Sequence, residues 1–206
     1  MLTKEQEFYK QGYKLIVGVD EAGRGPLCGP VVAGACILPI DYNNDDINDS
    51  KKLSELQREK AYEEITANCI AFGVGIVDPE TIDQINIYEA SRLAMKLAIK
   101  NMNHEYDLVI TDAMPIYIEG KKVLPFIKGD ATYKSIAAGS IIAKVTRDRI
   151  MNEYAKKYPM YHLEQNKGYP TKEHIALLNR YGPIKGFYRY TYGPVRNCII
   201  KQEKLF

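Results

Sequence analysis

The segment Val17–Pro30 reads VGVDEAGRGPLCGP, and it constrains the fold and function of this chain more than any other. It continues an apolar run that begins at Leu15, and such a run flanked by glycine is typical of a buried β-strand. The strand ends in two adjacent carboxylates, Asp20 and Glu21, followed at once by Gly23-Arg24-Gly25. Acids beside glycines that let the backbone approach a ligand indicate metal-assisted phosphate chemistry. Two acids alone also fit a plain acidic turn, and the arginine between two glycines weighs against that interpretation.

The bulk composition is that of an ordinary globular chain. Of its 206 residues, 46% are hydrophobic and 26% are charged, which suffices for one domain with a small helical appendage. No apolar run approaches the roughly 20 residues that cross a bilayer, and the first residues are too polar for a signal peptide. The cysteines (Cys28, Cys36, Cys69 and Cys198) lack the spacing of a zinc site. We therefore expect reduced thiols in a cytoplasmic protein.

The net charge of +2 hides an asymmetry along the chain. Residues 1–120 hold 11 Lys and Arg against 20 Asp and Glu, a net −9, whereas residues 121–206 hold 17 against 6, a net +11. A basic half favours binding to a polyanion, although solvated helix faces give the same count. Tyrosines interleave with these basic residues, and aromatic rings beside cations suit base stacking. The tyrosines are Tyr154, Tyr158, Tyr161, Tyr169, Tyr181, Tyr188, Tyr190 and Tyr192.

Apolar patterns and capping residues predict the secondary structure. Residues 15–19 and 31–38 are expected to pair as antiparallel strands, with further strands over 69–77 and 108–110. Ser54 with Gln57, and Asn86 with Glu89, predict the starts of two helices. The apolar segments 116–118 and 123–127 flank Glu119-Gly120 and predict a hairpin.

The second half of the chain is predicted to be mainly helical. Residues 135–157 form a long helix with an unusually small face around Gly139, which suits close packing against a sheet or a ligand. A final helix runs from Thr171 to Tyr181. These elements predict an α/β fold, a mixed sheet with helices on both sides, and a helical and tail extension over residues 158–206.

Four acids share one context in this predicted fold. Asp20, Glu21 and Asp112 end buried strands, and Asp130 follows the expected hairpin strand. Ligands of open α/β sheets bind at the carboxyl ends of strands, where these acids would repel one another without a divalent cation. Oxygen ligands suit Mg²⁺ or Mn²⁺, and two such ions about 4 Å apart can activate water for phosphodiester cleavage. Taken singly, Asp112 or Asp130 also fits the cap of a turn.

In this order along the chain, six sequence blocks jointly resemble ribonuclease HII, the type 2 branch of the ribonuclease H-like fold. The blocks are Gly18–Pro26, Asp49–Leu53, Thr111–Pro115, Lys128–Asp130, Ser135–Asp148 and Gly168–Thr171. The resemblance implies a single ribonuclease H-like catalytic domain over residues 1–206, with residues 158–206 as its substrate-binding extension.

The resemblance also implies a reaction. Enzymes of this family cleave the RNA strand of RNA–DNA hybrids and nick duplex DNA on the 5′ side of single ribonucleotides. They leave 3′-hydroxyl and 5′-phosphate ends. We therefore expect an endonuclease that takes part in ribonucleotide excision, DNA replication and DNA repair. We also expect it to be a monomer that does not associate with a membrane.

The resemblance assigns roles to individual residues. Asp20, Glu21, Asp112 and Asp130 become the catalytic, metal-binding carboxylates, with Asp20 shared by both ions. Only the 2′-hydroxyl distinguishes RNA from DNA, so Gly23, Arg24 and Gly25 are expected to grip the ribose and its phosphate. Tyr169 matches a tyrosine that stacks on the neighbouring sugar. Residues expected to support phosphate binding are Lys51, Ser135, Ser140 and Lys144.

Two residues depart from the family pattern, and one acidic residue within a family block is expected to have a structural role. Gly139 replaces a more common alanine, which loosens a helix by up to about 1 kcal/mol. Met114 replaces a leucine of similar volume. Asp148 is expected to form a structural ion pair with Arg147 or Arg149.

The last five residues carry a separate hypothesis. Gln202, Leu205 and Phe206 resemble the short peptide with which bacterial proteins bind a sliding clamp. An apolar Leu-Phe pair at a polar tail otherwise has no evident use.

Three other functions fit the sequence less well. A nucleotide-cofactor enzyme would need glycine where Cys28 stands. A metal-free nuclease would need histidines within a motif, whereas His104, His162 and His174 are expected at the surface. A non-catalytic nucleic-acid-binding module explains the basic half but not the four acids. The related ribonuclease HIII usually carries an extra N-terminal domain, and only a short segment precedes the first strand here.

Overall fold

The structure, a computed structural model, describes residues 4–42, 47 and 53–203. Its centre is a mixed five-stranded sheet of order β3-β2-β1-β4-β5. The strands are β1 (Ile16–Ala22), β2 (Val31–Ile37), β3 (Ala71–Val77), β4 (Leu108–Asp112) and β5 (Lys122–Phe126). β1 pairs antiparallel with β2, and β2 pairs antiparallel with β3, while β1, β4 and β5 run parallel. The expected mixed sheet, with its first antiparallel pair, is confirmed.

The hairpin predicted around Glu119-Gly120 is wrong. β5 pairs in parallel with β4, and residues 116–118 form no strand. Met114 and Ile116 are buried in the core under α3, so their apolar character reflects a crossover packed against the sheet. Parallel neighbours require such a crossover, because the chain must return to the same end of the sheet.

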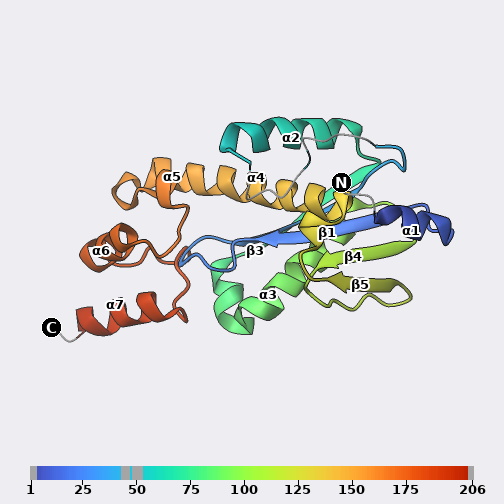
Figure 1. Cartoon of the computed structure of the whole chain (residues 1–206). Coiled ribbons are helices and arrows are strands. Elements are labelled where there is room, and N and C mark those ends of the chain that lie inside the picture. The colour runs from blue at the N-terminus through green and yellow to red at the C-terminus, as the bar shows by residue number, and fades with distance from the viewer. Residues whose placement is uncertain (1–3, 43–46, 48–52, 204–206) are drawn as a thin grey trace.

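Helices cover both faces of the sheet (Figure 1). α3 (Pro79–Met102) packs on one face, whereas α4 (Lys134–Lys157) packs on the other with α2 (Glu55–Asn68) outside it. The remaining helices are α1 (Glu5–Lys10), α5 (Leu163–Asn166), α6 (Lys172–Tyr181), α7 (Gly193–Glu203) and the short 3₁₀ turns η1 (Gly129–Ala131) and η2 (Pro159–Tyr161). In the described part of the chain, every helix is too short or too polar to span a membrane.

Two helix starts form as their capping residues predict. The Ser54 hydroxyl accepts from the Gln57 amide at 3.3 Å, and the Gln57 side chain accepts from the Ser54 amide at 2.8 Å. Asn86 adopts a left-handed φ of 68° that interrupts α3. Its side-chain oxygen accepts from the amides of Tyr88 and Glu89, so a new helical segment starts there.

The prediction that the helix ending at Tyr181 is the last one is wrong. α7 (Gly193–Glu203) follows it and packs against α6, with Val195 and Cys198 buried in the core that these helices share. The residue that precedes this helix, Tyr192, is not one of the Ser, Thr, Asp or Asn residues that usually cap a helix start, so that signal is missing. Helix α1 was also not predicted.

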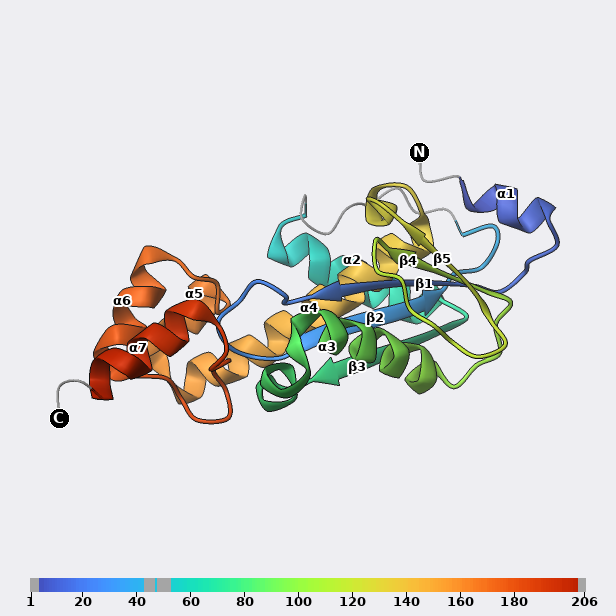
Figure 2. The same cartoon turned by 90° about the horizontal axis from the view of Figure 1, so that it is seen from below.

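The helices α5, α6 and α7 gather beyond the carboxyl end of β1 (Figures 1 and 2). They enclose a second core that includes Leu163, Leu178 and Phe187. The segment after β1 joins this core through main-chain bonds, with the Leu27 amide donating to the Gly168 carbonyl and the Gly29 amide to the Phe187 carbonyl, each at 2.8 Å. The chain after β1 is therefore shared between the sheet and the C-terminal helices.

The structure corrects the expected surface position of His174. The ring is buried, with Nδ1 2.9 Å from the Tyr169 carbonyl and Nε2 2.7 Å from the Tyr188 hydroxyl. It connects α6 to the second core, and burial lowers its pKa. His104 and His162 do lie at the surface, and the four cysteines are free thiols.

The close contact between α4 and the sheet depends on glycine. A Cβ on Gly18 of β1 would lie 2.0 Å from the carbonyl carbon of Ser135, and one on Gly34 of β2 would lie 2.3 Å from the Gly139 oxygen. A Cβ on Gly139 would in turn lie 2.7 Å from the Gly34 oxygen. The small face of this helix thus packs directly on the backbone of β1 and β2.

Gly18→Ala is expected to destabilise the protein by about 3 kcal/mol or more, because neither backbone can move away without separating helix and sheet. Urea denaturation followed by circular dichroism measures the effect. Gly193→Ala is the matched control, since a Cβ there meets nothing within 4 Å. Equal stability of the two variants would contradict the close contact.

Candidate active site

Three carboxylates meet at the carboxyl ends of β1 and β4. Val19 of β1 pairs with Thr111 of β4, so Asp20 and Asp112 leave neighbouring strands at the same edge. The 3₁₀ turn η1 brings Asp130 to them, because the Gly129 amide donates to Asp112 Oδ1 at 2.8 Å. One carboxylate oxygen from each of the three lies within 4.8 Å of the others, and Asp20 and Asp130 are buried.

Glu21 lies beside this group but outside the cluster of three. Its Oε1 is 3.3 Å from Arg24 Nη1, while its Oε2 is buried without a hydrogen-bond partner among the described residues. A buried carboxylate oxygen without a donor is costly, because it loses its hydration without compensation. The described protein groups therefore supply hydrogen bonds to only part of the Glu21 carboxylate.

The surroundings of Asp20 and Glu21 disfavour the charged form of both carboxyl groups. Burial is the main cause that raises the pKa of Asp20 well above its ordinary value, and the charges of Glu21 and Asp112 raise it further. A hydrogen bond from Ser140 acts in the opposite direction. Burial also raises the pKa of Glu21, against the lowering effect of Arg24.

This donor set suits a hard divalent cation. It consists of carboxylate oxygens from three aspartates, with the unsatisfied oxygen of Glu21 beside them. Oxygen ligands of this kind are those that Mg²⁺ and Mn²⁺ prefer, and a cation would offset the repulsion that raises these pKa values. The residues therefore fit the metal expected from the sequence.

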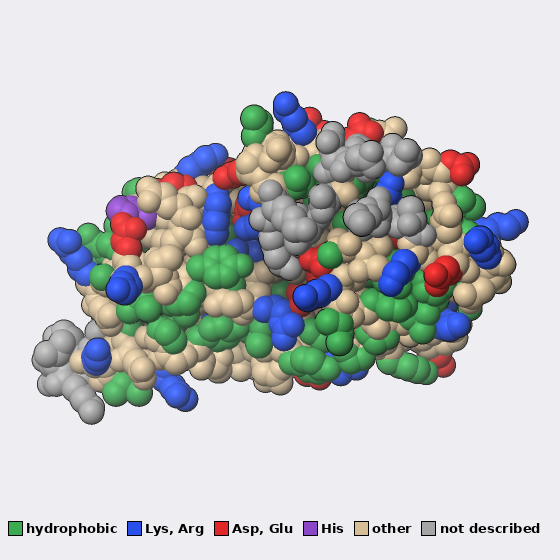
Figure 3. Space-filling model, in the orientation of Figure 1, with side chains coloured by type: hydrophobic (Ala, Val, Ile, Leu, Met, Phe, Trp, Pro, Cys, Tyr) green, Lys and Arg blue, Asp and Glu red, His purple; other side chains and the backbone are tan. Residues whose placement is uncertain are grey.

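A cavity of about 220 Å³ adjoins the carboxylates. It is lined by Asp20, Glu21, Ala22, Gly23, Arg24, Gly25, Ser140, Lys144 and Tyr169. On the face shown in Figure 3, Lys and Arg side chains lie beside a small acidic patch near the centre. The structure thus brings the predicted carboxylates, the glycine-flanked arginine, Ser140, Lys144 and Tyr169 to one site.

Ser135, expected to support phosphate binding, does not line this cavity. The Ser135 hydroxyl is buried and donates to Glu5 Oε1 at 2.6 Å, so it is occupied by α1 and unavailable to a phosphate. No sequence pattern around Glu5 indicated this contact, because the two residues are 130 positions apart. Lys51 lies outside the described residues.

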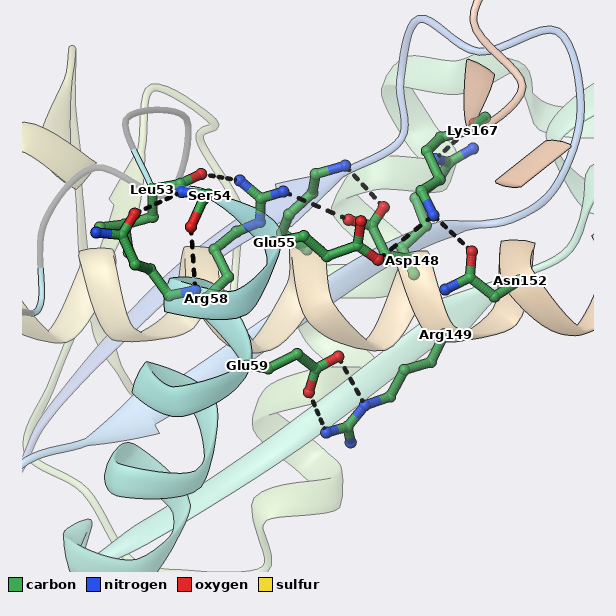
Figure 4. Close-up of polar contacts among 12 residues, drawn as sticks. Leu53, Ser54, Glu55, Arg58, Glu59, Asp148, Arg149, Asn152 and Lys167 are labelled. Carbon is green, nitrogen blue, oxygen red and sulfur yellow. Dashed lines mark hydrogen bonds and ion pairs between the residues drawn. The ribbon is translucent and has the colours of Figure 1, made fainter. Parts of the chain in front are cut away.

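The expected pairing of Asp148 with Arg147 or Arg149 is wrong. Asp148 accepts from Lys144 Nζ at 2.7 Å, one helical turn earlier, and lies 4.0 Å from Arg58 of α2 (Figure 4). Arg149 pairs instead with Glu59 of α2, as Figure 4 also shows. Residues adjacent in a helix point in different directions, whereas residues four apart share a face. Asp148 thus fixes Lys144 at the edge of the cavity.

The sequence did not indicate that two arginines, Arg147 and Arg189, are buried. Arg147 donates to the carbonyls of Pro30, Cys28 and Lys167 at 3.0–3.2 Å, and burial lowers its pKa to about 10. Gly23, at φ +100°, leaves room for this side chain, because a Cβ there would lie 2.3 Å from Arg147 Nε. Arg189 makes similar contacts from the C-terminal extension. Their carbonyl partners lie far away in the sequence, so no local pattern reveals them.

Comparisons with known proteins agree on one family. A family model described as Ribonuclease HII matches residues 17–193. Ribonuclease HII of Bacillus velezensis is 54% identical over 199 residues, which cover 96% of this chain and 76% of that protein. Ribonuclease HII of Bacillus subtilis is 50% identical over 197 residues, with the same coverage of 96% and 76%.

Solved structures show the same fold. Ribonuclease H2 from Pyrococcus horikoshii OT3 matches with a TM-score of 0.79 and 26% identity, covering 92% of this chain and 99% of that chain. The ribonuclease HII of Archaeoglobus fulgidus, solved as a complex with PCNA, matches with a TM-score of 0.71 and 27% identity, covering 86% and 95%.

Asp20→Asn is expected to raise the Tm of the protein in a metal chelator at pH 7. A carboxyl group whose pKa is raised on folding costs stability at every pH above its ordinary pKa. The gain from Asp20→Asn therefore grows as the pH rises from that ordinary value to the raised pKa, and it is lost as the pH falls back to the ordinary value. In a domain of this size, each kcal/mol corresponds to roughly 2–4 °C in Tm.

Thermal denaturation with and without Mn²⁺ completes this test. Mn²⁺ is expected to raise the Tm of the unmodified protein and of Asp41→Asn, which removes an exposed acid, but not that of Asp20→Asn. A lower Tm for Asp20→Asn than for Asp41→Asn in chelator would contradict the electrostatic cost.

Proposed function

The chain belongs to the ribonuclease HII family and is a ribonuclease H, a nuclease that hydrolyses phosphodiester bonds, and on this premise we propose which substrates it cuts and how. It cleaves the RNA strand of RNA–DNA hybrids and nicks duplex DNA on the 5′ side of a single ribonucleotide. The products carry 3′-hydroxyl and 5′-phosphate ends. The observation that carries this proposal is the carboxylate cluster beside a cavity lined by Gly23, Arg24 and Gly25.

We propose that Asp20, Glu21, Asp112 and Asp130 hold two divalent cations, Mg²⁺ or Mn²⁺, with Asp20 shared between them. Bound cations of this kind supply an activated water and stabilise the leaving oxygen. The clustered aspartate oxygens and the unsatisfied Glu21 Oε2 support this assignment. Bst-RNase HIII, which shares the fold with a TM-score of 0.72 at 16% identity, has been solved in complex with Mn²⁺.

Selection of a ribonucleotide is proposed to reside in Gly23-Arg24-Gly25. The 2′-hydroxyl both donates and accepts hydrogen bonds, and it is the group by which a protein distinguishes RNA from DNA. Arg24 is exposed at the mouth of the cavity, and its guanidinium can reach a phosphate. Main-chain groups at the two glycines can approach a ribose closely, since no side chain intervenes.

The residues opposite this loop are proposed to bind the rest of the substrate. Tyr169 is 44% exposed on the cavity wall, so its ring is available to stack on a neighbouring sugar. Lys144, held by Asp148, supplies positive charge to a phosphate, and Ser140 supports Asp20. The extension over residues 158–206 contributes basic surface to the duplex, which fits the net charge of the second half.

A sliding clamp is the proposed protein partner of an enzyme that otherwise acts as a monomer in replication and repair. The ribonuclease HII of Archaeoglobus fulgidus has been solved in complex with PCNA. In this chain the residues proposed to bind a clamp are Gln202, Leu205 and Phe206. Gln202 lies in the last turn of α7, while Leu205 and Phe206 lie outside the described residues.

A DNA duplex containing one ribonucleotide is expected to be nicked only when Mg²⁺ or Mn²⁺ is present, whereas an all-DNA duplex stays intact. Asp112→Asn should reduce the nicking rate at least about a thousand-fold, because it removes a charge that holds the cation. Gel electrophoresis of end-labelled strands measures the rate and the position of the nick.

Asp41→Asn serves as the control for this assay and should retain the rate. Circular dichroism establishes that Asp112→Asn is folded. Cutting in the presence of chelator, or equal cutting of the two duplexes, would overturn the proposed function.

A chain ending at Lys201 is expected to lose binding to a bacterial sliding clamp while keeping its nicking rate. Surface plasmon resonance with immobilised clamp compares this chain with the full one. Leu205→Ala with Phe206→Ala tests the pair in a chain of full length. If truncation leaves clamp affinity unchanged, the tail is not the binding element.

A further inference from the structure

Arg189 is a fully buried arginine whose guanidinium faces the backbone of the loop after β1. It donates to the carbonyls of Gly23 at 2.7 Å, Arg24 at 3.1 Å, Pro26 at 2.9 Å and Gly29 at 2.8 Å. A guanidinium carries five N–H groups in a rigid fork, and here they are directed at the carbonyls of a single loop. Arg189 thus holds most of this loop from outside the sheet.

Tyr192 adds a second contact to the same loop. Its hydroxyl donates to the Arg24 carbonyl at 2.7 Å and accepts from Arg189 Nη1 at 3.0 Å. The Arg24 carbonyl therefore receives two donors from one short segment of the C-terminal extension. This segment, Tyr188–Tyr192, is called the anchor segment below.

The anchor segment is itself fixed on both sides. The Asp83 carboxylate of α3 accepts from the amides of Tyr190 at 2.7 Å and Thr191 at 3.0 Å. On the other side, the Arg189 amide donates to the Leu27 carbonyl at 2.9 Å. α3 packs on the sheet. The anchor segment therefore connects the loop to the main core of the protein.

These contacts determine the direction in which the loop presents its donors. In a trans peptide, the carbonyl of one residue and the N–H of the next point in opposite directions. With the Gly23 and Arg24 carbonyls turned toward Arg189 and Tyr192, the amides of Arg24 and Gly25 are turned to the other side. Those amides belong to the residues that line the cavity beside the carboxylates.

We propose that Arg189 and Tyr192 are positioning residues that orient Gly23-Arg24-Gly25 for the ribose, so that the anchor segment controls the preference for ribonucleotides over deoxyribonucleotides. This inference rests on the proposed function, because it needs that loop to contact the ribose. Asp20, Asp112 and Asp130 are positioned by β1, β4 and η1, and the hydrogen bonds that join the anchor segment to the loop and to α3 do not involve them. A weaker anchor segment therefore lowers the preference for the ribonucleotide duplex more than it lowers the stability of the protein.

Tyr192→Phe tests the proposal, since it removes one hydroxyl and keeps the ring. In the Asp112→Asn background, which prevents cutting, fluorescence anisotropy gives the Kd for a duplex with one ribonucleotide and for an all-DNA duplex. The Kd for the all-DNA duplex divided by the Kd for the ribonucleotide duplex is expected to fall about five-fold, the effect of one neutral hydrogen bond. Asp83→Asn, which weakens the anchor from α3, should change the ratio in the same direction.

Tyr161→Phe is the matched control. It removes a hydroxyl that donates to the Gly182 carbonyl at 2.7 Å, within the same C-terminal core but away from the loop. Its Kd ratio should stay at that of the parent even if its Tm falls as far as that of Tyr192→Phe.

The outcomes separate this inference from the proposed function. An unchanged ratio in both Tyr192→Phe and Asp83→Asn, or an equal fall in Tyr161→Phe, would overturn the positioning role. Equal affinity of the Asp112→Asn parent for the two duplexes would instead contradict ribonucleotide recognition itself.

Discussion

The contact between α4 and the backbone of β1 and β2 is the constraint on which the rest of the structure depends. Gly18 and Gly34 leave no side chain between helix and sheet, so the separation of the two layers is set by backbone atoms. This close approach brings Ser140 within hydrogen-bond reach of Asp20 and buries that carboxylate. A larger residue at the contact would therefore change the packing and the chemistry together, because the same helix performs both tasks.

The cost of the site is the burial of like charges. Asp20, Asp112 and Asp130 converge because parallel strands end at one edge of the sheet, and η1 adds the third acid there. Without a cation, burial and mutual repulsion raise the pKa of Asp20, and Glu21 keeps an oxygen with no partner in the described chain. Such strain is expected where a protein retains groups for function at the expense of stability.

The loop after β1 joins this site to the C-terminal helices. Arg147 from α4 and Arg189 from the extension donate to its carbonyls. Within the extension, His174 connects the segment that carries Tyr169 to Tyr188. Burying two guanidinium groups is tolerated because their N–H groups are directed at carbonyl oxygens. The sheet thus supplies the carboxylates, while the extension holds the loop and the tyrosine on the other side of the cavity.

The sequence by itself determined the mixed sheet, the capped helix starts at Ser54 and Asn86, and the acids at strand ends, because these depend on local periodicity and hydrogen bonds. The blocks around Asp20 and Asp112 also identified the family. Tertiary structure alone decided the parallel pairing of β5, the burial of His174 and the partner of Asp148. Each of these depends on which distant segment lies opposite, and local patterns do not encode that. The buried arginines illustrate the reason most clearly: their partners are main-chain carbonyls, which every residue possesses.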